Sequence, residues 1–424
     1  MPDQPDCTLL LSDSLLLRVL SLVPLPHQLV LSLVCKRWCR IQGLLLQSIT
    51  LNDWSFLSSG RMFRRFPNLK QIDLSRTCVR TTMNSGVFIS SLLSVHIDAV
   101  NIEDTPLLIS GDDFIPRDMV DFGLGLISEH FPKLRRLSVV GPTEVGITDF
   151  FRGCDTLQEL ELHRCDDFSL KGIINGRNLR VVTLIGKVEG LYDSVISDLG
   201  LTIIANGCTQ LVKLELCGCE GSYDGIKAIG QCCPKLEEIC LRDHRMDGGW
   251  LSALSFCCYL RTLKFISCKS IDRSPGPEEH LGICPALQEL RLEMCRLRCN
   301  SEGMMALFSI CEGALKLVVK DCLGLEDEIF GYARILRRLR NVSVEGCSLL
   351  TTAGLESVVH GWCDLESLEV VSCNNVRDSE VSLKLSSLFS ALKELRWRPD
   401  SKSLLSSGLS GTGIGYKGGR FFKG

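Results

Sequence analysis

The sequence predicts an α/β protein in which a small helical module precedes a solenoid of strand–helix repeats. Two observations predict this class: a short apolar phrase recurs through most of the chain, and residues 9–50 lack that phrase. The composition agrees, because 424 residues that are 45% hydrophobic and 23% charged can bury a large core. We therefore divide the chain into an N-terminal tail (1–8), a helical module (9–50), a repeat region (51–400) and a C-terminal tail (401–424).

The repeated phrase reads apolar-x-x-apolar-x-apolar-x-x-Cys. Complete copies begin at Leu157, Leu211, Leu260, Leu287, Ala314, Leu339 and Leu365, and weaker copies without the cysteine begin at Leu69, Leu92, Leu134, Leu179, Leu236 and Leu392. These are about thirteen units, and most successive starts are 22 to 27 residues apart, the period of a leucine-rich repeat. Two longer steps, before Leu134 and before Leu211, predict insertions.

Each unit is expected to contribute one strand and one helix. The apolar-x-apolar centre of the phrase suits a short strand with one buried face, and the remainder of each unit has helical spacing, as in Leu355, Val358 and Val359. A single unit cannot bury its apolar edge, so units stack. The prediction is a curved horseshoe with parallel strands on its concave face and helices outside.

Most of the cysteines recur at two fixed positions of the repeat. Of 23 cysteines, seven close the phrase, and six more lie three residues before its first apolar position: Cys154, Cys208, Cys233, Cys257, Cys284 and Cys311. A small, weakly polar side chain buried at a tight turn explains this register. Metal binding is the alternative, but pairs such as Cys217/Cys219 and Cys232/Cys233 lack the two-residue separation of a zinc knuckle. We expect reduced structural thiols and no metal.

The N-terminal module is expected to be helical and to expose apolar side chains. Ser12 can cap a first helix, Pro24 and Pro26 can end it, and a later helix carries apolar residues up to Trp38. The apolar positions outnumber those that a core of this size can bury. Some of this surface is therefore expected to contact another protein.

This module resembles the F-box. Its ending, Val34-Cys35-Lys36-Arg37-Trp38, matches the Val-Cys-Lys-x-Trp ending of that family, while Ser12 and Ser14 stand where a proline and an acidic residue are usual. Followed by cysteine-containing repeats, it resembles the F-box/leucine-rich-repeat class of ribonuclease-inhibitor-like architecture. The Gly-Leu and Gly-Cys units are similar to those of its plant members.

The resemblance implies a non-catalytic substrate-recognition subunit of a Skp–cullin–F-box ubiquitin ligase. The F-box would bind the Skp adaptor, and through it cullin and a RING protein, while the solenoid binds an unknown target protein. Positions in the motif that would face the adaptor, or else form the small core, are Leu11, Ser12, Leu15, Leu16, Val19, Pro24, Val34, Cys35 and Trp38.

The concave face is the expected target site, because strand side chains alternate between core and solvent. The outward positions beside the apolar ones are Glu159, Glu161, Lys213, Glu215, Glu289, Arg291, Ser343, Glu345, Ser367 and Glu369. This surface is mixed but often acidic, which favours a basic segment in the target. The insertion at residues 101–121 is a second candidate contact, against the alternative of a surface excursion.

Other classes of function find little support in the sequence. The seven histidines are scattered, no nucleophile or metal signature appears, and a formal net charge of −3 lacks the basic excess of a nucleic-acid-binding protein. No cofactor is predicted, although two arginine clusters, Arg61/Arg64/Arg65 and Arg334/Arg337/Arg338/Arg340, leave open an inositol phosphate, and a small-molecule glue is also open.

The expected location is inside the cell, in the nucleus, the cytoplasm or both, because the N-terminus is acidic and no apolar run has the length of a membrane helix. Neither a membrane nor a nucleic acid is expected as a partner. The alternative function is a leucine-rich-repeat scaffold or regulatory interaction protein whose degenerate F-box no longer recruits the ligase. The glycine- and serine-rich tail, 401–424, is expected to be flexible.

Overall fold

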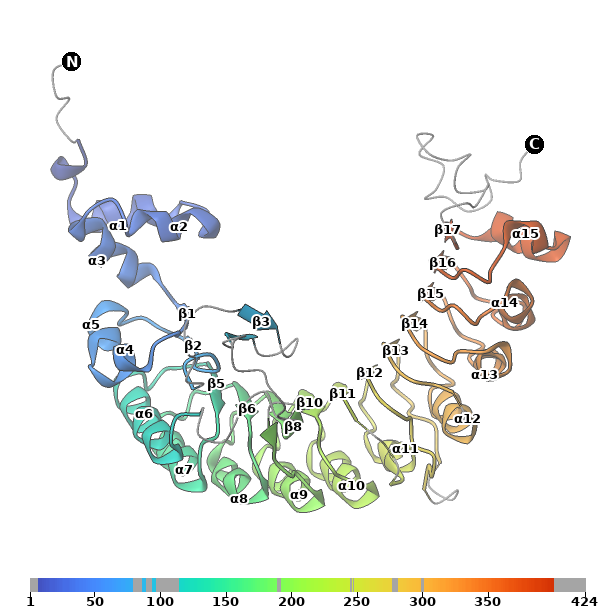
Figure 1. The fold of residues 1–424 in the computed structure, drawn as a ribbon, viewed down its shortest axis with the longest axis horizontal. Helices are drawn as coiled ribbons and strands as arrows, with labels where there is room; N and C mark the ends of the chain where they lie inside the picture. Colours follow the sequence, from blue (N-terminus) through green and yellow to red (C-terminus); the bar gives the residue numbers. More distant parts are fainter. Residues whose placement is uncertain are drawn as a thin grey trace, which may run out of the picture. The chain divides into compact units, whose positions relative to one another are not determined.

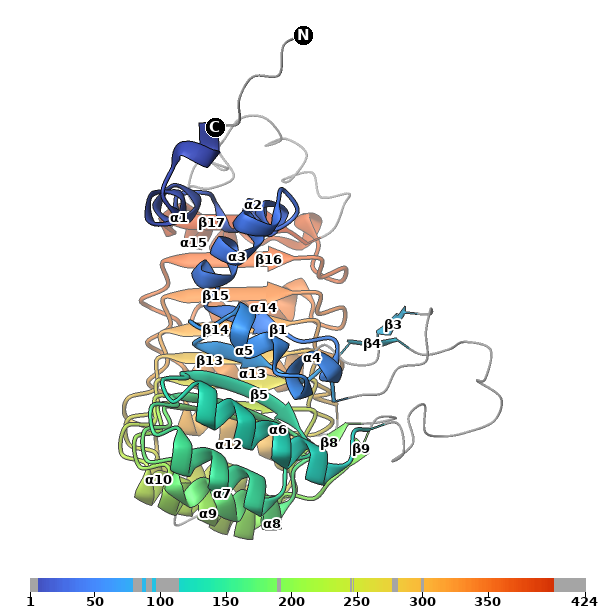
Figure 2. The ribbon, with the colours of Figure 1, turned by 90° about the vertical axis from the view of Figure 1, so that its left-hand side faces the viewer.

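The computed structural model divides into two compact units (Figures 1 and 2). Unit 1 comprises Met1–His163 with Gly190–Tyr192, and unit 2 comprises Arg164–Glu189 with Asp193–Gly424. The structure describes residues 7–78, 86–88, 94–96, 114–188, 192–244, 246, 248–276, 281–298 and 301–399. Within the described residues, no helix combines the length and the apolar composition needed to cross a bilayer.

Unit 1 begins with a helical module. A 3-10 turn (Cys7–Leu10) leads into α1 (Asp13–Ser21), α2 (Leu25–Leu31) and α3 (Lys36–Leu45). Its core is formed by Leu16, Leu20 and Ile41, each 1% exposed, with further apolar side chains packed around them. The predicted first helix, its capping residue Ser12 and the helical character of the module are confirmed. The prediction that Pro26 helps to end this helix was wrong, because α1 ends at Ser21 and Pro26 is the second residue of α2.

The remainder of unit 1 carries the first strand–helix repeats. Strands β1 (Ser48–Thr50), β2 (Gln71–Asp73), β5 (Arg136–Val140) and β6 (Glu159–His163) pair in parallel in that order. The helices of this part are α4 (Trp54–Ser58), α5 (Arg61–Arg65), α6 (Arg117–His130) and α7 (Glu144–Gly153). Strands β3 (Gly86–Phe88) and β4 (Ser94–His96) form a separate antiparallel pair.

Unit 2 is a longer array with its strands on one side and its helices on the other (Figure 1). Its nine described strands of the parallel sheet stack in sequence order, and each is five residues long. Figure 2 shows the last of them, β13 to β17, lying side by side. They are β7 (Val181–Ile185), β10 (Lys213–Cys217), β11 (Glu238–Arg242), β12 (Thr262–Ile266), β13 (Glu289–Glu293), β14 (Lys316–Lys320), β15 (Asn341–Glu345), β16 (Ser367–Val371) and β17 (Glu394–Arg398).

The helices of unit 2 vary in length from one turn to almost three turns. They are α8 (Asp167–Leu170), α9 (Asp198–Gly207), α10 (Tyr223–Cys232), α11 (Trp250–Ala253), α12 (Ser301–Ile310), α13 (Asp327–Gly331), α14 (Thr352–Val359) and α15 (Leu383–Ala391). Three are extended by 3-10 turns, η4 (Lys171–Asn175), η5 (Leu254–Phe256) and η7 (Tyr332–Ile335), and a separate 3-10 turn, η8 (Asp378–Glu380), precedes α15. The second predicted insertion holds two short strands, β8 (Lys187–Val188) and β9 (Tyr192–Asp193). The predicted α/β solenoid is confirmed.

The repeat phrase located the strands correctly in all but one unit. Every complete copy and five of the six weaker copies place a parallel strand two residues after the first apolar position. The prediction was wrong for the copy at Leu92, because β4 pairs antiparallel with β3 instead. An alternating pattern identifies a strand but not its partner. Strand β1, inside the predicted 9–50 module, was missed because no phrase accompanies it.

A tight turn follows most strands of the parallel sheet and extends the hydrogen bonding between neighbouring repeats. Asp243, Met294 and Gly346 have φ of 54°, 54° and 67°, in the left-handed region. Their backbone N–H groups donate to the last carbonyl of the next strand, as from Asp243 to Ile266 at 2.9 Å. The left-handed residue thus redirects the chain without leaving its own amide unsatisfied.

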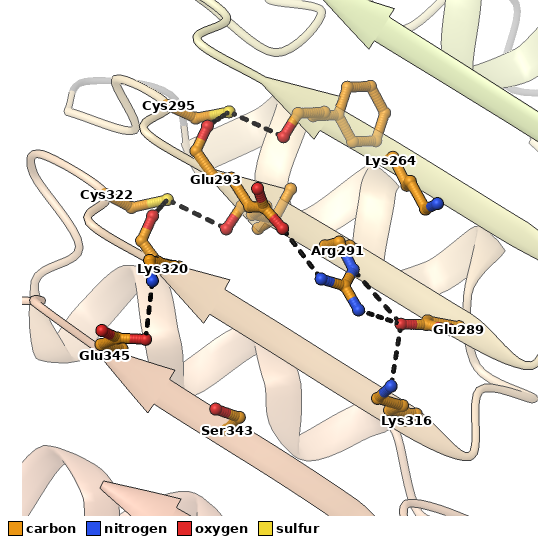
Figure 3. Close-up of polar contacts among 12 residues, drawn as sticks. Lys264, Glu289, Arg291, Glu293, Cys295, Lys316, Lys320, Cys322, Ser343 and Glu345 are labelled. Carbon is orange, nitrogen blue, oxygen red and sulfur yellow. Dashed lines mark hydrogen bonds and ion pairs between the residues drawn. The ribbon is translucent and has the colours of Figure 1, made fainter. Parts of the chain in front are cut away.

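The thirteen cysteines at the two repeated positions are all buried. Seven lie just after the turn that follows a strand, and five of the other six lie where the preceding helical segment ends. The Cys295 thiol lies 3.4 Å from the carbonyl oxygen of Phe265, and the Cys322 thiol lies 3.5 Å from that of Leu292, so each donates to the preceding repeat (Figure 3). Burial also raises the pKa of the Cys284 thiol to about 12. The structural interpretation of these thiols is therefore confirmed.

Aspartates at helix starts form a second link between repeats. The Asp327 carboxylate accepts hydrogen bonds from the N–H (2.8 Å) and the hydroxyl (2.5 Å) of Thr351, which caps the next helix. A Cβ on Gly354 would lie 2.0 Å from that carboxylate, so only glycine leaves room for it. The same arrangement joins Asp121 to Thr143/Gly146, Asp167 to Ser197/Gly200, and Asp198 to Ser222/Gly225.

Replacing Gly354 by alanine should destabilise unit 2 by about 1–3 kcal/mol, because the new methyl group displaces the Asp327 carboxylate from Thr351. Thermal unfolding followed by circular dichroism measures the loss. Gly331→Ala is the matched control, since a Cβ there meets nothing within 4 Å. Alanine is the better helix former by about 1 kcal/mol, so this variant should be neutral or more stable. Equal destabilisation by both changes would contradict the role assigned to Gly354.

His244 occupies the cysteine position of its repeat and gives the fold a dependence on pH. Burial lowers the pKa of its imidazole from 6.5 to about 4, and its Nε2 has no hydrogen-bond partner. The unfolded chain therefore binds the proton more readily, and stability should fall as the pH drops from about 6.5 towards 4. Urea unfolding should show a loss of about 2 kcal/mol between pH 7 and pH 5 from this group.

The His244→Cys variant should lack this part of the pH dependence, because it carries the residue of the other repeats. A His244→Cys protein with an unchanged slope would show that other groups cause the acid sensitivity.

Candidate functional site

The nine predicted adaptor-facing residues separate into surface and core. Leu15 and Val19, one turn apart on α1, are 53% and 51% exposed. Leu16 lies between them in sequence but is 1% exposed and forms the core. Ser12, Pro24, Val34 and Cys35 are also exposed, whereas Leu11 and Trp38 are half-buried and pack against that core. Leu16 therefore supports the module and does not present a side chain to a partner.

The module exposes further large apolar side chains that the motif positions did not indicate. Leu10, Leu22, Val30 and Leu33 are 88%, 81%, 58% and 82% exposed. When several leucines follow one another in a helix, the orientation of the helix about its own axis determines which of them is exposed. The signal available in the sequence was the excess of apolar residues in this module.

Charged and capping groups hold α1 and α3 in place beneath this surface. The Arg37 guanidinium donates to the Asp13 carboxylate at 2.8 Å and to the Thr8 carbonyl at 3.0 Å, and Arg40 also pairs with Asp13. The hydrogen bond from Arg37 lowers the pKa of Asp13 below its usual value. Cys35 caps α3, accepting from the N–H of Trp38 at 3.5 Å. The matched motif Val34–Trp38 thus fixes how α3 begins.

The second candidate surface is the strand face of unit 2, whose charged side chains pair with one another across strands. On β10 to β12, the Glu238 carboxylate lies 3.1 Å from the Lys213 ammonium and 2.8 Å from that of Lys264. Beside it, Arg242 pairs with Glu215 at 3.0 Å. The predicted outward positions are correct, but these side chains already have partners.

The pairing continues through the middle of the array (Figure 3). Arg291 contacts Glu289 at 2.8 Å and Glu293 at 3.0 Å on its own strand, and Lys316 on the next strand also contacts Glu289, at 3.1 Å. Burial alone would raise the pKa of Glu289, but hydrogen bonds from Arg291 and Lys316 lower it below the usual value. Further along, Lys320 pairs with Glu345 at 3.0 Å.

The last strands and unit 1 show the same behaviour. Glu369 accepts a hydrogen bond from the Ser343 hydroxyl at 2.9 Å and pairs with Arg396, while Ser367 occupies a half-buried outward position. In unit 1, Arg136 lies 3.5 Å from Glu159 and 3.6 Å from Glu161. The acidic side chains are thus matched by cations on the same or the next strand. This pairing removes the basis for expecting a basic segment in the target.

The remaining candidates are the insertion at residues 101–121, the C-terminal tail and the two arginine clusters. Residues 101–113 of the insertion and the tail 401–424 lie outside the described residues. Phe114 and Ile115 are buried, at 5% and 8% exposure, and α6 already begins at Arg117. The two arginine clusters lie on α5 and on η7 with its following turn. Among the described residues, no group of three or more metal-ligating side chains comes together.

A known domain family matches the N-terminal module. Residues 9–43 match the F-box domain model. A putative RNA-binding protein of Caenorhabditis elegans is 26% identical over 200 residues, which are 45% of this chain, and the chain spans about a quarter (26%) of that protein's length.

Two solved structures are also similar. An internalin from Listeria monocytogenes aligns with a TM-score of 0.40 at 15% identity, covering 65% of this chain and 71% of its own. A TLR13–ssRNA13 complex aligns with a TM-score of 0.39 at 14% identity, covering 83% of this chain and 57% of its own. Residues 9–43 thus carry an F-box domain, and the strand–helix repeats described above follow it along the chain.

Proposed function

We propose that the protein is the substrate-recognition subunit of a Skp–cullin–F-box ubiquitin ligase. The observation that carries the proposal is the coincidence of the F-box match with a module that leaves large apolar side chains in solvent. In this role the F-box binds the Skp adaptor, which links it to cullin and a RING protein, and the array binds the target. Such a receptor acts in the nucleus or cytoplasm.

The exposed apolar side chains supply the driving force for adaptor binding. Fully burying a leucine or valine contributes about 1.5–3 kcal/mol, so Leu15 and Val19 together can account for a substantial part of a stable interface. Their spacing of one turn places both on the same face of α1. The Arg37–Asp13 pair fixes the start of this helix, which reduces the entropy lost on binding.

Target binding is assigned to the strand face of the array. The ion pairs around Arg291 and Glu238 hold long side chains in defined positions, so the face is ordered before a target arrives. A target that binds there has to replace these internal ion pairs with ion pairs to its own charged groups. Affinity is therefore highest for a target whose positive and negative groups are placed opposite the matching side chains of the face. The residues proposed earlier in unit 2, from Lys213 to Glu369, remain the proposed set there, and Glu159 and Glu161 remain the proposed residues on the strand face of unit 1.

Catalysis is assigned to other subunits. Two of the described histidines belong to the packed interior: His163 is buried against Glu161 at 2.8 Å, and the Nε2 of buried His244 has no hydrogen-bond partner. The chain is therefore proposed to position proteins and to leave the chemistry to the ligase machinery.

A scaffold that does not recruit the ligase is the second candidate. It is favoured by Ser12 and Ser14, which replace the usual proline and acidic residue of the F-box and whose hydroxyl oxygens lie 3.0 Å apart. Without the carboxylate, one polar contact to the adaptor is absent. The apolar surface alone then has to provide the affinity.

The double variant Leu15→Ser/Val19→Ser should weaken binding of purified Skp adaptor at least about tenfold, because it removes two exposed apolar contacts and leaves the core intact. Biolayer interferometry with the full-length chain measures the affinity. Leu16→Ala is unsuitable for this purpose, since Leu16 lies in the core and its loss destabilises the module.

The matched control is Leu199→Ser/Val145→Ser, which alters apolar side chains of similar exposure (54% and 64%) on the helices of the array. It should bind the adaptor as the wild type does. Wild-type protein that does not bind the adaptor would contradict the ligase role and support the scaffold, and equal losses in both variants would contradict the assignment of the surface.

A further inference from the structure

A cavity of about 430 Å³ opens in unit 1 beside the end of α3. It is lined by that helix end and by the two turns that lead into β2 and β5. Its volume falls within the range of pockets that hold small organic ligands. The lining residues used below are Leu44, Gln47, Leu69, Lys70, Phe131 and Lys133.

Backbone and side-chain hydrogen bonds fix the walls of the cavity. The Asn68 amide donates to the Leu44 carbonyl at 2.8 Å, and the N–H groups of Lys70 and Gln71 donate to the Gln47 carbonyl at 2.8 and 2.9 Å. Leu69 and Phe131 are each 4% exposed, so the apolar wall belongs to the packed interior. The cavity is therefore formed before any ligand binds.

The polar lining is basic. Lys70, Lys133 and His130 line the cavity, which has no carboxylate among its lining residues. Both lysines are exposed, and neither forms an ion pair with any described residue. They differ in this respect from Lys213, Lys264 and Lys316 on the strand face, which all have acidic partners.

The C-terminus of α6 does not explain why Lys70 and Lys133 are present. A cation near a helix C-terminus can interact with the last carbonyls. In α6 this position is taken by His130, whose Nδ1 lies 2.9 Å from the Leu126 carbonyl oxygen and whose ring stacks on Phe63 at 4.0 Å. Lys70 precedes a strand, where there is no helix end to complement.

We propose that this cavity binds a small amphipathic carboxylate. Leu44, Leu69 and Phe131 would contact the apolar body of the ligand, and the ammonium groups of Lys70 and Lys133 would bind its carboxylate. A charged group next to an apolar wall selects against both a neutral alcohol and a cationic analogue of the same shape. The site is separate from the exposed apolar side chains proposed to bind the adaptor.

The test uses 4-phenylbutyrate as the probe, with 4-phenylbutylamine and 4-phenylbutanol as isosteric cationic and neutral analogues. Saturation-transfer NMR on the full-length protein should detect the carboxylate at millimolar concentration and show at least about fivefold weaker binding of the other two. In Lys70→Gln/Lys133→Gln, carboxylate affinity should fall at least about fivefold, while thermal stability without ligand stays close to that of the wild type.

Lys235→Gln is the matched control. Lys235 occupies the same place in the Pro234-Lys235-Leu236 turn as Lys133 does in Pro132-Lys133-Leu134, but it lies outside the cavity. This variant should bind the probe as the wild type does. The proposal is overturned if the wild type does not bind phenylbutyrate, if the amine binds equally well, or if the cavity variant and Lys235→Gln lose the same affinity.

Discussion

The hydrogen bonds between neighbouring repeats are the interaction on which the structure depends. A five-residue strand buries one row of side chains but leaves backbone groups that only an adjacent strand can satisfy. Several repeats of unit 2 add further links: a thiol that donates to the preceding repeat, as from Cys295, or an aspartate that holds the next helix start, as Asp327 does. The order of the strands therefore fixes every surface that the array presents.

This dependence explains what the sequence could predict. A phrase with constant spacing located twelve strands, because stacked units must keep the same apolar positions. The Leu92 copy was misassigned, because two or three alternating residues do not distinguish a parallel rung from a hairpin. The Asp327–Thr351–Gly354 link was missed because its members come from different repeats, although Ser/Thr-x-x-Gly recurs at the helix starts and was a usable signal.

The candidate surfaces were less predictable than the fold. In the run Leu15-Leu16, composition cannot distinguish the exposed leucine from the buried one, and the two exchange roles with a rotation of about 100° on the helix. On the strand face, the outward positions followed from alternation, but their partners did not. Glu238 contacts lysines 25 and 26 positions away, and the stacking of strands alone brings them together.

The distribution of paired and unpaired groups separates the roles of the surfaces. Charges on the strand face satisfy one another, so binding there has to replace existing contacts and favours a partner that matches many of them at once. Leu15 and Val19 are about half exposed, and Lys70 and Lys133 form no ion pair with a described residue, so binding at either surface breaks no charge pair. Exposed apolar side chains favour an apolar partner surface, and unpaired lysines favour an anion. Under the proposed function, adaptor binding would therefore rest on a few apolar residues, and discrimination between targets would rest on the strand face.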